Sequence, residues 1–216
     1  MQSPSGKAQA ALRMRVVEAK FLVSAAGPTD GVGYPAEAAP EIAFVGRSNV
    51  GKSTLLQALL GRRGLVRTSR DPGRTRLVNF FEAVVMEEPG VTRAVRLVDL
   101  PGFGYAKASR EERAKFRPIV QQYLEGRTAL KAAALLVDLR RGAEVEEIDL
   151  ARFLAGYSRQ VIAVGTKADK LSKHERKPAT EKLAKQLGLP VCAVSGDSGE
   201  GLEALWRRLL VAVGPA

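Results

Sequence analysis

The sequence has very little cysteine, histidine or tryptophan, one residue of each in 216, and no long apolar run. A single cysteine excludes an internal disulfide and is typical of a reducing cytoplasm, where we expect the protein to act. We expect Cys192 and Trp206 in the core and His174 on the surface. Because a helix needs about 18 consecutive apolar residues to cross a membrane, no membrane-spanning segment is expected. Internal repeats and low-complexity tracts are absent as well, which favours one globular domain.

Acidic residues are scarce relative to basic ones. The chain has 23 Asp and Glu against 34 Lys and Arg, a net charge of +11. A surplus of this size is typical of a protein that binds a large polyanion, and we expect RNA, with no DNA and no membrane among the partners. The alternative is a basic surface that serves solubility alone.

One stretch has the pattern G-x-x-x-x-G-K-S, formed by Gly46-Arg47-Ser48-Asn49-Val50-Gly51-Lys52-Ser53. It follows the apolar run 42–45 and precedes the helical stretch 52–60, so it has the strand–loop–helix setting of a phosphate-binding P-loop. The glycines let the backbone curl around phosphate, and the helix start directs its N–H groups there. We expect residues up to Thr54 to line the phosphate site. Lys52 is expected to reach the β- and γ-phosphates, and the Ser53 hydroxyl to ligate Mg²⁺.

Strands and helices alternate along the rest of the chain, which predicts an α/β fold with helices on both faces of a mostly parallel sheet. Six strands are expected, at 42–45, 77–87, 93–99, 132–139, 161–165 and 191–194. The second and third are joined by a short turn and must be antiparallel, which gives one reversed edge strand. Helices are expected at 52–60, 109–125, 144–157, 172–187 and 202–211. Residues 16–24 are a further short-strand candidate. We expect a flexible extension over 1–20 and a single domain over 21–216.

A base-recognition motif follows the strand at 161–165 and comprises Thr166, Lys167, Asp169 and Lys170. A carboxylate at Asp169 can accept hydrogen bonds from both N1–H and the 2-amino group of guanine, whereas adenine has no such pair of donors. The Lys167 stem can lie flat on the base. The loop after the last strand is expected to close over the base, through Val194, Ser195 and Gly196. These residues favour GTP and GDP as ligands over the adenine nucleotides of a P-loop ATPase.

Two further segments are expected to sense the γ-phosphate. Asp99 ends the strand at 93–99 and is suited to hold Mg²⁺ through water, and the Gly102 N–H can approach the γ-phosphate. An earlier segment contains Gly73, Arg74 and Thr75, and Thr75 is the candidate for the second hydroxyl on Mg²⁺. We therefore expect Ser53, Thr75 and Asp99 at the metal and Lys52, Thr75 and Gly102 in catalysis. Basic residues flank both segments, at positions 62–76 and 107–117.

Together these motifs resemble the EngB family of ribosome-biogenesis GTP-binding proteins, within the translation-factor-related P-loop GTPases. The resemblance is carried by residues 40–53, 72–75, 79–81, 99–106 and 166–170. Asp71 and Gly196 depart from it, since the family usually has Thr before Pro72 and Ser or Ala after Ser195. The resemblance implies a Ras-like G domain, a role in assembly of the large ribosomal subunit from its rRNA-containing precursor, and a link to normal division septation. We expect a monomer.

The hydrolytic step is expected to be slow. Many small GTPases have a water-orienting glutamine after the Asp-x-x-Gly element, but here Phe103 occupies that position. Related GTPases with asparagine at the position of Asn49 bind K⁺ near the phosphates, so K⁺ is a second candidate cofactor. Two alternatives compete with this interpretation. One is a GTP-sensing module with negligible hydrolysis. The other is the G domain of a membrane transporter or of a tRNA-modifying enzyme, and the expected lack of a membrane-spanning segment and of a second domain argues strongly against it.

Overall fold

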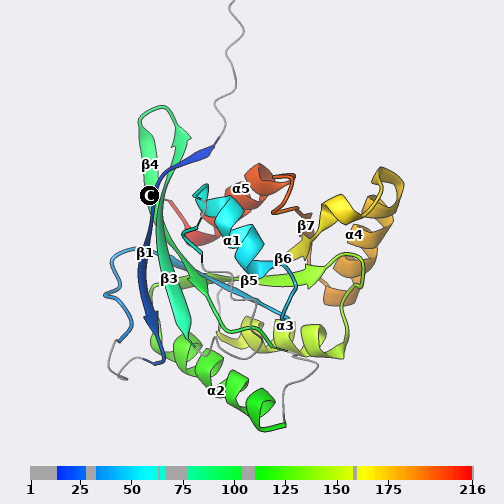
Figure 1. The fold of residues 1–216 in the computed structure, drawn as a ribbon, viewed down its shortest axis with the longest axis horizontal. Coiled ribbons are helices and arrows are strands. Elements are labelled where there is room, and N and C mark those ends of the chain that lie inside the picture. The colour runs from blue at the N-terminus through cyan, green and yellow to red at the C-terminus, as the bar shows by residue number, and fades with distance from the viewer. Residues whose placement is uncertain are drawn as a thin grey trace, which may run out of the picture.

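The computed structural model describes residues 14–27, 33–62, 64–66, 77–103, 110–157 and 160–215, with residues 110–117 described through their backbone alone. These residues form one seven-stranded sheet in the spatial order β1-β3-β4-β2-β5-β6-β7 (Figure 1). Its strands are β1 (Arg15–Ala25), β2 (Glu41–Gly46), β3 (Val78–Glu88), β4 (Val91–Asp99), β5 (Leu130–Asp138), β6 (Val161–Thr166) and β7 (Val191–Ala193).

The sheet has one strand more than the six that we predicted. The seventh is β1, which pairs antiparallel with β3 and occupies the edge, so the reversed strand β3 lies second from the edge. The predicted domain boundary between residues 20 and 21 therefore falls inside a strand that belongs to the sheet. The strand candidate at residues 16–24 is confirmed as β1, although it was not counted among the six. The strand carries two register shifts, which interrupt the alternation of buried and exposed side chains.

Five α-helices cover the described sheet, three on one face and two on the other (Figure 1). They are α1 (Lys52–Leu60), α2 (Arg110–Gly126), α3 (Val145–Tyr157), α4 (Lys173–Leu187) and α5 (Leu202–Val213). The apolar side chains of α1 and α5 pack with one face of the sheet, and those of α2, α3 and α4 pack with the other. Trp206 lies in the first of these cores and Cys192 is buried there too, as predicted. His174 is exposed, also as predicted.

Several helix ends agree with the sequence signals. Gly61 and Gly188 adopt left-handed conformations after α1 and α4. Ser172 caps α4 in a reciprocal capping box with Glu175, so this predicted start is confirmed. The predicted start of the helix at 109–125 lies outside the residues whose side chains are described.

A buried polar network closes the end of the sheet where β2 begins. Glu41 is fully buried and accepts hydrogen bonds from Tyr123 Oη at 2.9 Å and from Arg127 Nε at 3.1 Å. Arg96 Nη1 lies 3.7 Å from Glu41 Oε1. The Arg127 guanidinium also lies 5.6 Å from the centre of the Phe80 ring. Through these contacts Glu41, the first residue of β2, links this strand to β4 and to the chain that follows α2.

At the opposite end of the sheet, the carboxyl ends of the parallel strands β4, β2, β5 and β6 come together. Phe44 pairs with Asp99, Gly46 with Leu136, and Asp138 with Thr166. Open α/β sheets bind their ligands at this edge. The predicted phosphate and base motifs both begin there.

Candidate functional site

The loop between β2 and α1 is built for close approach of its backbone to a ligand. Asn49 and Gly51 have positive φ angles of 63° and 99°, which turn the chain twice before α1 begins. Alternation of this kind curves successive N–H groups into an anion-binding nest. The first N–H groups of α1 add to it, because a helix start has no internal partners for them. A Cβ on Gly46 would lie 2.9 Å from Leu136 O, so the loop also packs tightly against β5.

Lys52 and Asp99 meet at the mouth of this loop. The Lys52 ammonium donates to Asp99 Oδ1, and Asn79 Nδ2 lies 3.4 Å from Asp99 Oδ2. Asp99 is 5% exposed. The structure therefore places the predicted phosphate-binding lysine beside the predicted Mg²⁺-binding carboxylate. Ser53 follows directly in the first turn of α1.

The segment after Asp99 is joined to the loop by backbone hydrogen bonds. Phe103 N donates to Gly46 O at 3.3 Å, and Ser48 N donates to Phe103 O at 2.8 Å. A Cβ on Gly102 would lie 3.1 Å from Ser48 Oγ. The predicted γ-phosphate sensor therefore lies directly against the phosphate loop.

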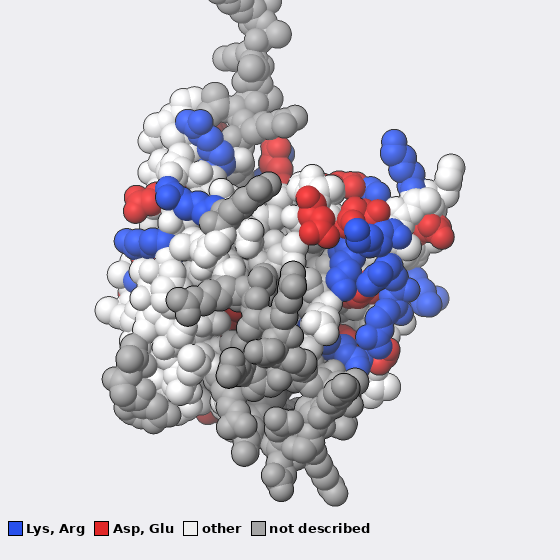
Figure 2. Space-filling view, in the orientation of Figure 1, with Lys and Arg blue, Asp and Glu red and all other residues white. Residues whose placement is uncertain are grey.

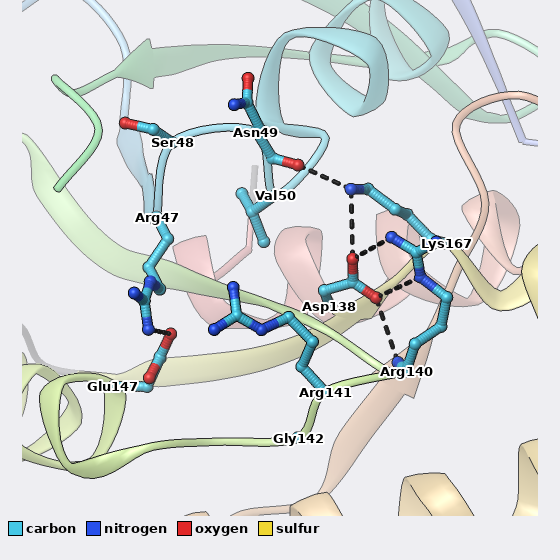
Figure 3. A pocket seen from close by; sticks show the side chains of 10 residues that line it. All are labelled: Arg47, Ser48, Asn49, Val50, Asp138, Arg140, Arg141, Gly142, Glu147 and Lys167. Atoms are coloured by element: carbon cyan, nitrogen blue, oxygen red, sulfur yellow. Dashed lines mark hydrogen bonds and ion pairs between the residues drawn. The ribbon is translucent and has the colours of Figure 1, made fainter. Parts of the chain in front are cut away.

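The base motif is hydrogen-bonded to the same loop through Lys167 (Figure 3). Thr166 Oγ1 donates to Val50 O at 2.7 Å, and Lys167 Nζ donates to Asn49 O at 2.6 Å. Lys167 has a φ of 59°, a left-handed conformation rare for a residue with a side chain. A Cβ on Gly51 would lie 3.6 Å from Lys167 Cε, so the lysine stem passes beside the P-loop.

Asp169 carries a buried acceptor that the described residues leave unused. Its Oδ2 pairs with Lys170 Nζ at 3.0 Å, whereas Oδ1 is buried and has no hydrogen-bond partner among the described residues. The Ser195 hydroxyl and then the Lys170 ammonium lower the pKa of Asp169, so the group is a carboxylate at neutral pH. A buried carboxylate oxygen of this kind suits an N–H donor from a ligand.

The loop after β7 reaches both the base motif and α1. Ala168 N donates to Val194 O at 3.0 Å, and Ser195 Oγ accepts from the backbone N–H groups of Asp197 and Ser198 at 3.2 and 3.1 Å. A Cβ on Gly196 would lie 2.9 Å from the backbone of α1 at Leu55 N. A side chain at this position would therefore require the loop or α1 to shift.

A cavity of about 400 Å³ adjoins the loop on the side of β5 and α3 (Figure 3). Arg47 enters it and pairs with Glu144 at 2.6 Å, and lies 3.6 Å from Glu147. Asp138 and Arg140 lie at its other end, beside Lys167. None of the acidic partners was a sequence candidate. Asp138 could have been identified from the sequence, because it is a carboxylate near the end of an apolar strand and Asp99 was selected on that criterion.

The remaining sequence candidates for this site belong to the segment that precedes β3 in the sequence. Gly73, Arg74 and Thr75 lie outside the described residues, as do most of the basic residues predicted to flank the two sensing segments. Within the described part of the chain, no helix is long and apolar enough to cross a membrane.

Comparison with known proteins identifies relatives over nearly the whole chain. The family model described as "50S ribosome-binding GTPase" matches residues 41–167. The probable GTP-binding protein EngB of Myxococcus xanthus is 41% identical over 200 residues, which cover 91% of this chain and 95% of the relative. The probable EngB of Syntrophotalea carbinolica is 45% identical over 203 residues, which cover 93% of each chain.

Solved structures agree. A crystal structure of a probable EngB superposes with a TM-score of 0.62 and 25% identity, and covers 80% of this chain and 98% of that one. The GTPase Era of Aquifex aeolicus bound to GDP and AlF4⁻ gives a TM-score of 0.67 at 25% identity, over 82% of this chain and 57% of Era. The predicted Ras-like α/β fold is thereby confirmed. With its P-loop, its guanine-type motif and these matches, the chain belongs to the EngB family of GTP-binding proteins and is a P-loop GTPase.

Proposed function

We propose that this GTPase is a nucleotide switch that acts in assembly of the large ribosomal subunit, and that normal cell division depends on it. The observation that carries the proposal is the shared attachment to one loop. The base motif forms hydrogen bonds to the P-loop backbone at Asn49 and Val50. The γ-phosphate sensor forms hydrogen bonds to the same backbone at Gly46 and Ser48. A nucleotide in this loop would contact both segments at once.

The geometry supports the following ligand contacts. The N–H groups of residues 46–54 donate hydrogen bonds to the phosphates. The Lys52 ammonium leaves Asp99 and binds phosphate oxygens instead. Asp169 Oδ1 accepts from the N1–H and 2-amino group of guanine, with Lys170 beside it. The Lys167 stem lies along the base, while Val194, Ser195 and Gly196 close its far edge. Gly73, Arg74 and Thr75 complete the site in this proposal.

Mg²⁺ is the proposed metal. A serine hydroxyl and a carboxylate are the hard oxygen donors that Mg²⁺ prefers, and Ser53 and Asp99 lie at neighbouring ends of α1 and β4. Thr75 would supply a second hydroxyl. A further solved relative supports the choice: Era crystallised with MgGDPNP and nucleotides 1506–1542 of 16S rRNA superposes with a TM-score of 0.65 at 26% identity. When bound, the ion would neutralise charge between the β- and γ-phosphates.

Intrinsic hydrolysis is proposed to be slow. Lys52 and the Gly102 N–H stabilise negative charge on the γ-phosphate, but Phe103 has no side-chain group that can orient the attacking water. The missing stabilisation comes from the ribosomal partner or from K⁺ near Asn49. The Asn49 side chain supports this location, because it points away from Asp138 (Figure 3).

Ribosomal RNA of the large-subunit precursor is the proposed partner of a monomeric, cytoplasmic protein. The net charge of +11 supports a polyanion. Lys and Arg side chains gather on the side of the molecule that carries α4, with acidic side chains among them (Figure 2). That helix holds five Lys or Arg and two Glu. The description of the matching family model, which names the 50S ribosome, points to the large subunit.

Phosphate release under multiple turnover tests the proposal. We expect slow release from GTP by the protein alone, and at least tenfold faster release when purified large subunits are added in K⁺ buffer. Na⁺ in place of K⁺ separates a cation effect from a ribosomal one. Release that stays at background under all conditions would favour the second candidate, a GTP-sensing ribosome-binding module, for which Phe103 is the specific argument.

A further inference from the structure

A buried carboxylate connects the base motif with the phosphate loop. Asp138 is the last residue of β5 and is 8% exposed. Its Oδ2 lies 3.1 Å from Lys167 Nζ, and the same ammonium donates to Asn49 O at 2.6 Å (Figure 3). The lysine head is therefore held between an acidic side chain and a loop carbonyl. Asp138 has no part in the contacts with GTP proposed above.

Arg140 holds the carboxylate in place. Asp138 Oδ1 accepts from Arg140 N at 3.1 Å and from Nε at 2.9 Å, and Oδ2 accepts from Nη2 at 2.6 Å. Such a bidentate pair fixes the plane of the carboxylate as well as its position. Although burial opposes its charge, hydrogen bonds from Arg140 and Lys167 lower the pKa of Asp138 to about 2. The group stays ionised throughout the physiological range.

Lys167 needs this support. Its backbone is in the left-handed region, and its long stem would otherwise sample many rotamers. Ordering a free lysine side chain has a cost in conformational entropy. Two acceptors on the ammonium restrict these rotamers and leave the stem beside Gly51, where the base would stack. A ligand then meets a stem that is already ordered.

We infer that Asp138 is a positioning residue for guanine nucleotides, which acts by holding Lys167 between the base and the P-loop carbonyl of Asn49. The inference rests on the proposed contact of Lys167 with the base. Because the acceptor on Lys167 is a P-loop carbonyl, the same bonds hold the phosphate loop and the base site in one arrangement. Loss of the carboxylate should shorten the lifetime of the bound nucleotide.

The test is a double-mutant cycle with Asp138→Asn and Lys167→Met, read as the dissociation rate of a fluorescent GDP analogue and the affinity for unlabelled GDP. Asparagine matches aspartate in size but has no charge. We expect about tenfold faster dissociation for D138N in the wild-type background. In the Lys167→Met background the same change should have less than a twofold effect, because the residue through which it acts is gone. Asp149→Asn is the matched control, an exposed carboxylate on α3 that lies 3.5 Å from Arg152.

Two results would overturn the inference: an unchanged dissociation rate in D138N, or an equal acceleration with and without Lys167. If Lys167→Met itself leaves GDP binding unchanged, the proposed base contact of Lys167 is what fails. If D138N does not fold, Arg140→Gln is used in its place. This change removes the partner that holds the Asp138 carboxylate but leaves the charge of Asp138 intact. Two- to threefold faster dissociation that disappears in the Lys167→Met background is then expected, and persistence there would contradict the inference.

Discussion

Replacing Asp169 by asparagine should reverse the base preference of the protein. Guanine would donate two hydrogen bonds to this carboxylate, and hydrogen bonds to charged groups contribute about 1.5–3 kcal/mol each. We use the lower figure, because the Asp169 side chain is 18% exposed and Lys170 already occupies Oδ2. Loss of about 3 kcal/mol corresponds to a roughly hundredfold weaker affinity for GDP. The change should also admit xanthosine diphosphate, whose 2-carbonyl accepts from the new amide while its N1–H donates to the amide oxygen.

The assay is displacement of a fluorescent GDP analogue by GDP and by xanthosine diphosphate. Asp197→Asn is the matched control, an exposed carboxylate in the loop after β7. Its side-chain charge is lost, but its backbone N–H still donates to Ser195. We expect the control to keep the wild-type preference and Asp169→Asn to favour the xanthine nucleotide. An unchanged ratio of the two affinities in Asp169→Asn would refute the assignment of the base site.

Three further predictions concern stability and its dependence on pH. Gly196→Ala should lower stability by about 1–3 kcal/mol in thermal unfolding, because its Cβ would lie 2.9 Å from the backbone of α1; Gly156→Ala, which has open space around it, should be neutral. Glu41→Gln should cost about 3–5 kcal/mol in urea unfolding, because it leaves buried arginines without their carboxylate; the exposed Glu181→Gln should cost less than about 0.5 kcal/mol. The pKa of Asp138 is lowered from 3.8 to about 2, so its stabilisation is present above pH 4 and is lost as pH falls toward 2. The difference in urea midpoint between wild type and Asp138→Asn should therefore shrink over that window, and a constant difference would contradict the pKa.

Most elements of the fold could be predicted because local chemistry and packing agree in them. The strand β5 is a nearly continuous apolar run, and α4 begins at a Ser–Glu capping box. The edge strand β1 is different. One side faces solvent, and shifts at Val16/Glu18 and Phe21/Val23 break its period. Its pairing with β3 depends on contacts more than fifty residues away, which no local pattern contains.

The candidate site was predictable as a set of residue types but not as a set of contacts. The P-loop and the base motif could be recognised from glycine spacing and from polar residues that end apolar strands. The partners of Arg47 could not, since Glu144 and Glu147 come from the start of α3, almost a hundred residues later. The pairing of Asp138 with Lys167 likewise requires the register of β5 against β6, and side-chain patterns alone do not contain that register.

The proposed role in ribosome assembly is tested most directly by sedimentation with purified large ribosomal subunits. The protein would be loaded with GDP or with a non-hydrolysable GTP analogue, each at low and at high salt. We predict co-sedimentation that is stronger with the GTP analogue and that falls as salt rises, because release of counterions from RNA favours binding at low salt. Equal co-sedimentation in both nucleotide states, or none in either, would contradict a switch that acts on the large subunit.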